Sequence, residues 1–432
     1  MPVWMNILIA VLLTHLPTAR CDTNSAPRNI AVILPESGEW AVDGLSMHNA
    51  AVMAAEDLSS PNDSPFRLWF YDDCGDPDSA QSLAEHLVST GEVSALMGGY
   101  PSATAEAIIQ VLANPEIPFL IMSSSADSLT MGSGSPVFRI APPTSLYNDG
   151  LFAFAAGVVG VDQRLAVVYD GSKDWANRLT ELQTDIKDKW SGEVRYLSLP
   201  ISTYDLKGLV QDLSRFDPRA VWMLIGTGDA ARLLIDCRQS DWAPAAFLLG
   251  SVNLANLRLV SASDGAAEYV YAPAVWFPTP VNPQASGFKR RFMERFGEEP
   301  DYHAAETYAA VQVMDDAQRR SMEQGITLRR ALSETDLATV LGRMQFQDFG
   351  EFQRQSRVQT LALQLIQNQW RVIWPLEEAQ DRYVYPTPEW RERLKPPRIN
   401  QNQSLYNLLF IFVTGALLIA ALIRRRQLLK RM

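Results

Sequence analysis

The chain has 432 residues, of which 47% are hydrophobic and 20% are charged, and its formal net charge at pH 7 is −11. These values describe an ordinary folded protein with room for two lobes, and the acidic balance is a poor match for nucleic-acid phosphates, so we expect no nucleic-acid partner. The three cysteines outline no disulfide framework and the four scattered histidines lack metal-ligand spacing, so we predict no metal and no cofactor.

The N-terminus has the pattern of a secretory signal peptide. Ile7–Leu13 is an apolar run too short to span a membrane, and small residues follow it up to Ala19. We therefore assign residues 1–21 to a signal peptide, with cleavage near Ala19 to Cys21. Arg20 stands where a lipidation signal needs a small residue, which disfavours a lipoprotein anchored through Cys21.

Strand and helix patterns then alternate along the chain. Short, nearly unbroken apolar runs predict strands, and apolar residues at helical spacing predict the helices between them. The first series has strands at Ile30–Leu34, Arg67–Tyr71, Ser94–Met97 and Phe119–Met122 and helices at Gly44–Leu58, Ser79–Ser89 and Ala103–Ala113. A Ser-rich loop follows the last of these strands.

A second series of the same kind begins at Leu165. Its strands are predicted at Leu165–Tyr169, Val194–Leu199, Ala220–Ile225 and Phe247–Leu249, and its helices at Trp175–Lys189, Leu206–Phe216 and Ala230–Ser240. Two consecutive βα series predict an α/β fold with two Rossmann-like lobes, each built on a parallel sheet.

The C-terminus has the pattern of a membrane anchor. Residues 376–404 are polar and include several prolines, which is typical of a stalk. Leu405–Ile423 is then an uncharged apolar run close to the length of a transmembrane helix, and the basic tail 424–432 follows directly. Because clustered Lys and Arg stay on the cytoplasmic side, we expect a cytoplasmic tail and an extracytoplasmic body anchored in the membrane.

Several segments carry, in the right order, a resemblance to one protein family. They are IAVILPESGEWAVDGLSMHNAAVMAAED at Ile30–Asp57, LWFYDDCGDPDSA at Leu68–Ala80, GGYPSAT at Gly98–Thr104, IPFLIMSSSADSLT at Ile117–Thr130, LAVVYDGSKDWANRL at Leu165–Leu179, FKRRFMERFGEEP at Phe288–Pro300, TYAAVQ at Thr307–Gln312 and FQDFGEF at Phe346–Phe352. Together they make the chain similar to the leucine/isoleucine/valine-binding protein family, the type I solute-binding proteins of ABC importers. The similarity covers most of residues 27–375.

The resemblance implies a bilobal binding domain at residues 27–375 with a solute held in a cleft between its lobes. One lobe would comprise residues 27–142 and 275–350, and the other residues 143–273 and 351–375. The resemblance also implies that the chain works with a membrane-embedded permease, and that its body lies in the periplasm while its anchor lies in the inner membrane.

Serines after two strands of the first series are candidate ligand-binding residues. Ser102 follows the strand that ends at Met97, and Ser124 and Ser125 follow the strand at Phe119–Met122. Ligands of open parallel sheets bind beyond the carboxyl ends of the strands, where hydroxyl and backbone N–H groups suit a carboxylate. The alternative for each serine is a plain helix N-cap. The family-matched positions favour binding.

On the other lobe, the resemblance places an aromatic cover over the ligand at Trp175 and further ligand contacts at Thr227 and Asn253. The sequence departs from the family here, because no carboxylate stands near Asn253 to receive the ammonium of an amino acid. An unpaired ammonium in a closed cleft would cost several kcal/mol, so an unmodified branched-chain amino acid is a doubtful ligand. Asp43 or Asp174 could supply that charge, or either could be a solvated loop carboxylate or helix cap.

An enzyme is a remote alternative. Gly226–Ala231, GTGDAA, matches the dinucleotide-binding fingerprint G-x-G-x-x-A, but the acid that should bind the ribose about twenty residues later is missing. No nucleophile elbow or carboxylate pair at a recognisable spacing is present. We therefore predict no catalytic residues and no enzymatic activity.

The predicted function is that of a membrane-anchored solute-binding protein. It would capture a small polar or amino-acid-like molecule by lobe closure and present it to an ABC-type importer. Because a transmembrane anchor would hold the chain beside one partner, a ligand sensor or an accessory or scaffold subunit of a membrane complex is the alternative.

Overall fold

The computed structural model describes residues 28–58, 65–112, 117–132, 136–199, 206–240 and 242–388. The chain divides into two compact units. The first unit holds the residues up to Leu146 and Val275–Gln359, and the second holds Tyr147–Ala274 and the residues from Thr360 onward. The predicted signal peptide, the apolar run Leu405–Ile423 and the basic tail lie outside the described residues. Within the described ranges, no helix is long and apolar enough to cross a membrane.

The first unit is built on an eight-stranded sheet with the order β11-β12-β13-β5-β4-β3-β1-β2. Its strands are β1 (Arg28–Leu34), β2 (Phe66–Asp72), β3 (Ala95–Gly98), β4 (Phe119–Ile121), β5 (Val137–Arg139), β11 (Asp336–Thr339), β12 (Gly342–Phe349) and β13 (Phe352–Ser356). Neighbours from β2 to β13 pair in parallel, whereas β12 pairs antiparallel with β11 and β13.

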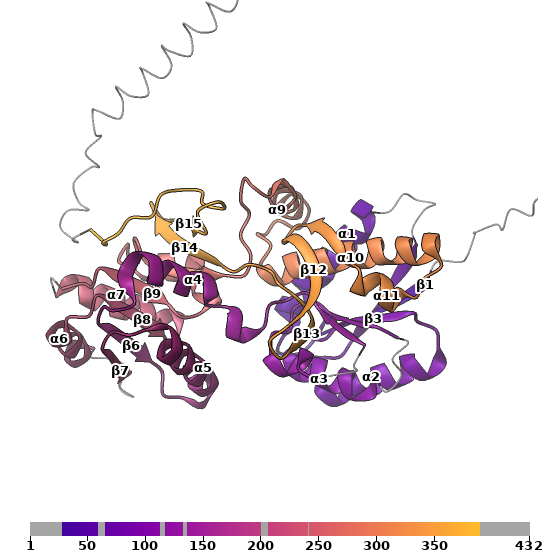
Figure 1. Ribbon diagram of the computed structural model, residues 1–432, viewed down its shortest axis with the longest axis horizontal. Helices are drawn as coiled ribbons and strands as arrows, with labels where there is room; N and C mark the ends of the chain where they lie inside the picture. Colours follow the sequence, from indigo (N-terminus) through magenta and orange to yellow (C-terminus); the bar gives the residue numbers. More distant parts are fainter. Residues whose placement is uncertain are drawn as a thin grey trace, which may run out of the picture. The chain divides into compact units, whose positions relative to one another are not determined.

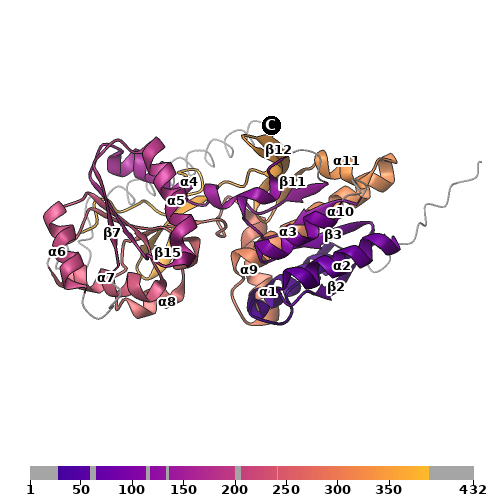
Figure 2. The same ribbon diagram turned by 90° about the horizontal axis from the view of Figure 1, so that it is seen from below.

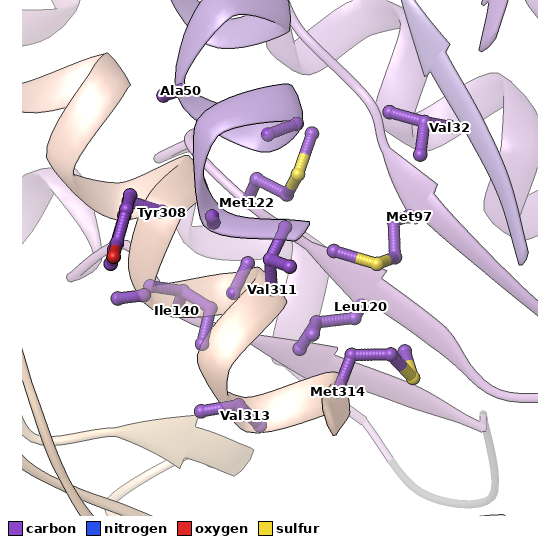
Figure 3. Close-up of a cluster of buried hydrophobic side chains, with 14 of the residues drawn as sticks. Val32, Ala50, Met97, Leu120, Met122, Ile140, Tyr308, Val311, Val313 and Met314 are labelled. Atoms are coloured by element: carbon purple, nitrogen blue, oxygen red, sulfur yellow. The ribbon is translucent and has the colours of Figure 1, made fainter. Parts of the chain in front are cut away.

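Helices cover both faces of this sheet (Figure 1). They are α1 (Ala41–Leu58), α2 (Pro77–Thr90), α3 (Ser102–Val111), η1 (Asp127–Thr130), η2 (Thr144–Leu146), α9 (Pro283–Phe296), α10 (Tyr302–Gln324) and α11 (Leu328–Ser333). Helices α1 and α10 share a core with one face, and α2 and α3 share a second core with the other. Figure 3 shows Met97 and Leu120 of the sheet beside Val311 and Met314 of α10.

The second unit is built on a seven-stranded sheet with the order β15-β14-β10-β9-β8-β6-β7. Its strands are β6 (Leu165–Tyr169), β7 (Val194–Ser198), β8 (Ala220–Leu224), β9 (Ala246–Leu249), β10 (Tyr271–Ala274), β14 (Leu361–Ile366) and β15 (Gln369–Trp374). Its helical segments are α4 (Asp149–Phe154), the π-helical η3 (Ala155–Gly160), α5 (Lys173–Lys189), α6 (Lys207–Phe216), α7 (Thr227–Gln239), η4 (Val252–Leu254) and α8 (Leu257–Ala262). Helices α6, α7 and α8 pack on one face of the sheet, and α4 and α5 on the other (Figure 2).

The predicted α/β architecture with two sheet-based lobes is confirmed, with two differences. First, both sheets are mixed, since β14 and β15 add antiparallel strands to the second sheet as β11 and β12 do to the first. Second, the boundaries differ from those expected at 142 and 350. The segment 352–356 forms β13, which pairs with β5 and so belongs to the first unit rather than the second.

The first part of the predicted stalk is packed against the second unit. The backbone N–H of Thr387 donates to the carbonyl of Ala245 at 2.8 Å. Gln364 of β14 binds Val384 through both ends of its side-chain amide, at 2.8 and 3.0 Å. These hydrogen bonds place Val384 and Thr387 in the folded domain, which therefore extends beyond the expected boundary at 375.

Candidate functional site

The carboxyl ends of β1, β3 and β4 form one edge of the first sheet, because these strands are parallel neighbours. Ser102 is the first residue of α3, which follows β3, and Ser124 and Ser125 follow β4. The N-cap of α3 is Pro101 and that of η1 is Ala126, so none of the three serines caps the helix beside it. The structure thus brings all three serines to the edge where ligands of parallel sheets bind.

The three hydroxyl groups are not equivalent. Ser124 is buried and its hydroxyl donates to the carbonyl of Gly99 at 2.5 Å, so it holds two loops together. The half-buried Ser102 accepts the backbone N–H of Ala126 at 3.2 Å, which leaves its own proton for another acceptor. The hydroxyl of Ser125 accepts from that of Thr144 at 3.0 Å. Ser102 and Ser125 are therefore the better placed of the three for a ligand.

Asp43 lies in the first turn of α1 and is bound to a residue that sequence reasoning missed. The hydroxyl of Tyr100 donates to a carboxylate oxygen of Asp43 at 2.9 Å. Trp40 packs edge-on against the Tyr100 ring, with 5.7 Å between the ring centroids. Tyr100 stands in the GGYPSAT segment directly after β3, and a tyrosine at a strand end is the feature that could have identified it. The Asp43 carboxylate is thus shared with a phenol.

Beneath this edge lies a buried polar cluster that the sequence analysis also missed. The hydroxyl of Ser123 lies 2.5 Å from Nδ1 of His303 and donates to a carboxyl oxygen of Glu306. Burial raises the pKa of Glu306 to about 8 and lowers the pKa of His303. His303 and Glu306 are three residues apart on α10, a spacing that places them on one face of the helix.

This cluster does not have the geometry of a hydrolytic triad. In a triad the imidazole lies between the nucleophile and the acid, whereas here the Ser123 hydroxyl lies between His303 and Glu306. Ser123 is also 2% exposed, so a substrate could not reach it. The cluster is therefore a structural and titratable element.

The carboxyl ends of β6, β8 and β9 form the corresponding edge of the second sheet. Trp175 lies in the first turn of α5 after β6, Thr227 is the first residue of α7 after β8, and Asn253 lies in η4 after β9. The structure therefore brings these three predicted residues to one edge. The side chain of Asp174 lies outside the described part of the structure.

Trp175 is in contact with a charged residue that sequence reasoning did not single out. The guanidinium carbon of Arg178 lies 5.5 Å from the centroid of the Trp175 ring. The same guanidinium donates from Nη1 to the hydroxyl of Ser251 at 3.0 Å. Residues three apart share a helix face, so the spacing of Trp175 and Arg178 in α5 could have identified this pair. The Ser251 contact depends on the sheet order and could not be read from the sequence.

Comparisons with known proteins agree with this architecture. Residues 27–363 match the family model described as periplasmic binding protein. A curated relative, Leu/Ile/Val-binding protein homolog 7 of Brucella suis, is 22% identical over 329 residues, covering 72% of this chain and 82% of the relative.

Two solved structures share the fold. One is an ABC transporter substrate-binding protein from Sphaerobacter thermophilus, which superimposes with a TM-score of 0.66 at 19% identity, covering 84% of this chain and 99% of that one. The other is the branched-chain amino acid transporter substrate-binding protein LivJ of Streptococcus pneumoniae in complex with isoleucine, with a TM-score of 0.60 at 17% identity, covering 83% of this chain and all of that one. The chain belongs to the periplasmic binding protein family, as a type I member of the leucine/isoleucine/valine-binding group, and it is a solute-binding protein rather than an enzyme.

Proposed function

We propose that this chain is a membrane-anchored, extracytoplasmic solute-binding protein for an ABC-type importer. It captures a small polar or amino-acid-like molecule when its two units close on the solute. The observation that carries this proposal is the gathering of polar and aromatic side chains at the carboxyl edge of each sheet, where α/β folds bind ligands.

The names of similar proteins add to this proposal. The Brucella relative is named as a Leu/Ile/Val-binding homologue, and the pneumococcal structure contains isoleucine. Transport of a related small molecule is the simplest role for a chain of the same family. The ligand need not be the same, because Ser251 and Asn253 stand where amino-acid binders of the family carry a carboxylate.

The anchor supports a second candidate role. Leu405–Ile423 and its basic flank would fix the chain beside one membrane partner with its tail in the cytoplasm. A reporter fused after Met432 should then be active only as a cytoplasmic reporter. A tethered binding protein could also serve as a ligand sensor or as an accessory or scaffold subunit of a membrane complex.

Two measurements test the proposal on the full chain purified in detergent. Mass spectrometry of the heat-released fraction should identify a small solute in near-stoichiometric amount. Dyes attached at D78C and R215C, on exposed positions of α2 and α6, should then move closer when that solute is added back to a C74S chain. If the chain releases no solute and its dye distance stays the same with every solute offered, it is a scaffold.

A further inference from the structure

The second unit presents a cation at the edge of its sheet. Arg178 projects from α5 and is fixed by two neighbours: the Trp175 ring, with the guanidinium carbon 5.5 Å from its centroid, and the Ser251 hydroxyl at 3.0 Å. Ser251 is 5% exposed and also accepts the N–H of Asn253 at 3.4 Å, so it is itself a fixed acceptor. The guanidinium is therefore held in one place rather than left free in solvent.

Most of the hydrogen-bonding capacity of Arg178 remains available. A guanidinium has five N–H donors in a planar fork that fits a carboxylate, and the contact with Ser251 uses one. Among the residues whose side chains the structure describes, no carboxylate forms an ion pair with Arg178. The group is half-buried, so an anion that reaches it would be partly shielded from water.

The neighbouring elements at this edge also favour negative charge. Helices α5 and α7 both begin here, and the N-cap residues Ser172 and Gly226 make no side-chain capping hydrogen bond. Two carboxylates lie nearby: Asp229 pairs with Arg232 at 2.8 Å, and Asp170 accepts the backbone N–H of Ser172 at 2.8 Å without a cationic partner among the described side chains. In the described part of the unit, neither carboxylate forms an ion pair with Arg178.

We propose that Arg178 is a specificity-determining residue that binds the carboxylate of an organic acid lacking an ammonium group. This inference rests on the proposed solute-binding function and names its substrate class. An amino acid would bring its ammonium towards the Arg178 guanidinium, and the repulsion between the two like charges disfavours it. A monocarboxylate meets a fork of donors, an aromatic face and two helix N-termini.

Two matched sets of compounds test the inference by calorimetry on the full chain. One set is 4-methylpentanoate, L-leucine and 3-methylbutylamine, and the other is 3-phenylpropanoate, L-phenylalanine and 2-phenylethylamine. Within a set the hydrophobic part is shared, while the charge changes from anion to zwitterion to cation. We expect the acid to bind at least tenfold more tightly than the other two members in at least one set.

Variants then assign the effect to Arg178. R178Q should weaken acid binding at least tenfold, and R178K should lie between it and the native chain because it keeps the charge without the fork. R164Q is the matched control: Arg164 lies 5.7 Å from the Phe216 ring and pairs with Asp217, just before the amino end of β6. R164Q should leave acid binding unchanged.

The outcomes separate the two proposals. Tighter binding of the zwitterion or amine, or an unchanged acid affinity in R178Q, would overturn the role of Arg178 and leave solute binding intact. If none of the six compounds binds but a solute is released on heating, the monocarboxylate class is wrong and the proposed function stands. If there is neither binding nor released solute, both proposals fail.

Discussion

The two sheet edges have the same architecture and different chemistry. The first edge carries neutral hydroxyls and an aspartate that is already bound by Tyr100. The second carries an indole and a fixed guanidinium. Both edges arise from parallel neighbouring strands followed by helices, so the fold dictates where a ligand can bind but not which one. The loop residues, which are free of core packing, decide the charge that each edge presents.

The largest expected effect is on stability, and it concerns two glycines, one at the carboxyl edge of each sheet. Gly98 ends β3 with φ +125°, and a Cβ there would lie 2.0 Å from the carbonyl oxygen of Ile33, which is backbone and cannot move aside. G98A should therefore lower the stability of the first unit by about 3 kcal/mol or more. G250A meets the side chain of Trp222 at 2.6 Å without positive φ and should cost less, about 2 kcal/mol.

Differential scanning calorimetry of the full chain would test this ranking. G132A is the control for positive φ alone, since Gly132 has φ +97° and a Cβ added there would meet no atom within 4 Å. Equal melting temperatures for G98A and G132A would show that the close approach to Ile33 is unimportant.

The second prediction compares the tryptophans of the two edges. Trp175 is in contact with Arg178, so W175A should weaken binding of the released solute by about 2 kcal/mol, in the range of aromatic hot spots. Because Trp175 also packs against the core of its unit, W175A should lower the apo melting temperature as well. W40A removes a ring that contacts Tyr100 only edge-on and should weaken binding less.

Titration calorimetry and apo melting curves would separate the two effects of W175A. An affinity unchanged by W175A, together with a lower melting temperature, would make Trp175 a core residue only.

The third prediction concerns how the stability of the fold depends on pH. It rests on the buried cluster of Ser123, His303 and Glu306, which has no counterpart among the described residues of the second unit. The pKa of Glu306 is raised from 4.5 to about 8, so the folded state holds a proton that the unfolded state releases. The stability that this proton provides is fully present below pH 4.5 and is lost as the pH rises through 8. Because one pKa unit corresponds to about 1.4 kcal/mol, we expect a loss of up to about 4 kcal/mol between pH 5 and 9.

The variant E306Q should flatten this dependence, whereas E294Q, at an exposed position of α9, should not. The groups around Glu306 limit the pH range over which its proton affects stability. His303 has a lowered pKa, so its protonation destabilises the fold below pH 6.5, while Arg139 lowers and Asp301 raises the pKa of Glu306. Melting temperatures of E306Q that still fall between pH 7 and 9 as in the native chain would contradict the prediction.

The smallest expected effects separate two serines of the first edge. S124A removes a buried hydroxyl that binds Gly99, so it should cost about 1 kcal/mol of stability with little direct loss of affinity. S102A should do the reverse and weaken solute binding about fivefold with a small effect on melting, since its hydroxyl has a proton to donate to a ligand. Stability and affinity measured on both variants would reveal whether these roles are exchanged.

The fold was largely predictable because local sequence patterns indicate where most of its strands and helices lie. β6 occupies the expected residues 165–169, and most helices begin within a few residues of their predicted starts, since apolar periodicity reports burial directly. The strands that return to each sheet late in the chain, β11 to β15, were not predictable. β13 joins β5 across more than two hundred residues, and no local pattern reports a partner that distant.

The sequence by itself determined the two βα series, the family and the loops in which ligand-binding residues should lie, because these follow from periodicity, order and strand ends. Only the tertiary structure decided what those residues do. It tied Ser124 to Gly99, joined Asp43 to Tyr100 and brought Arg178 from α5 to Ser251 after β9. Such contacts join segments far apart in the chain, so the neighbours that set the charge of each edge are chosen by sheet order rather than by spacing in the sequence.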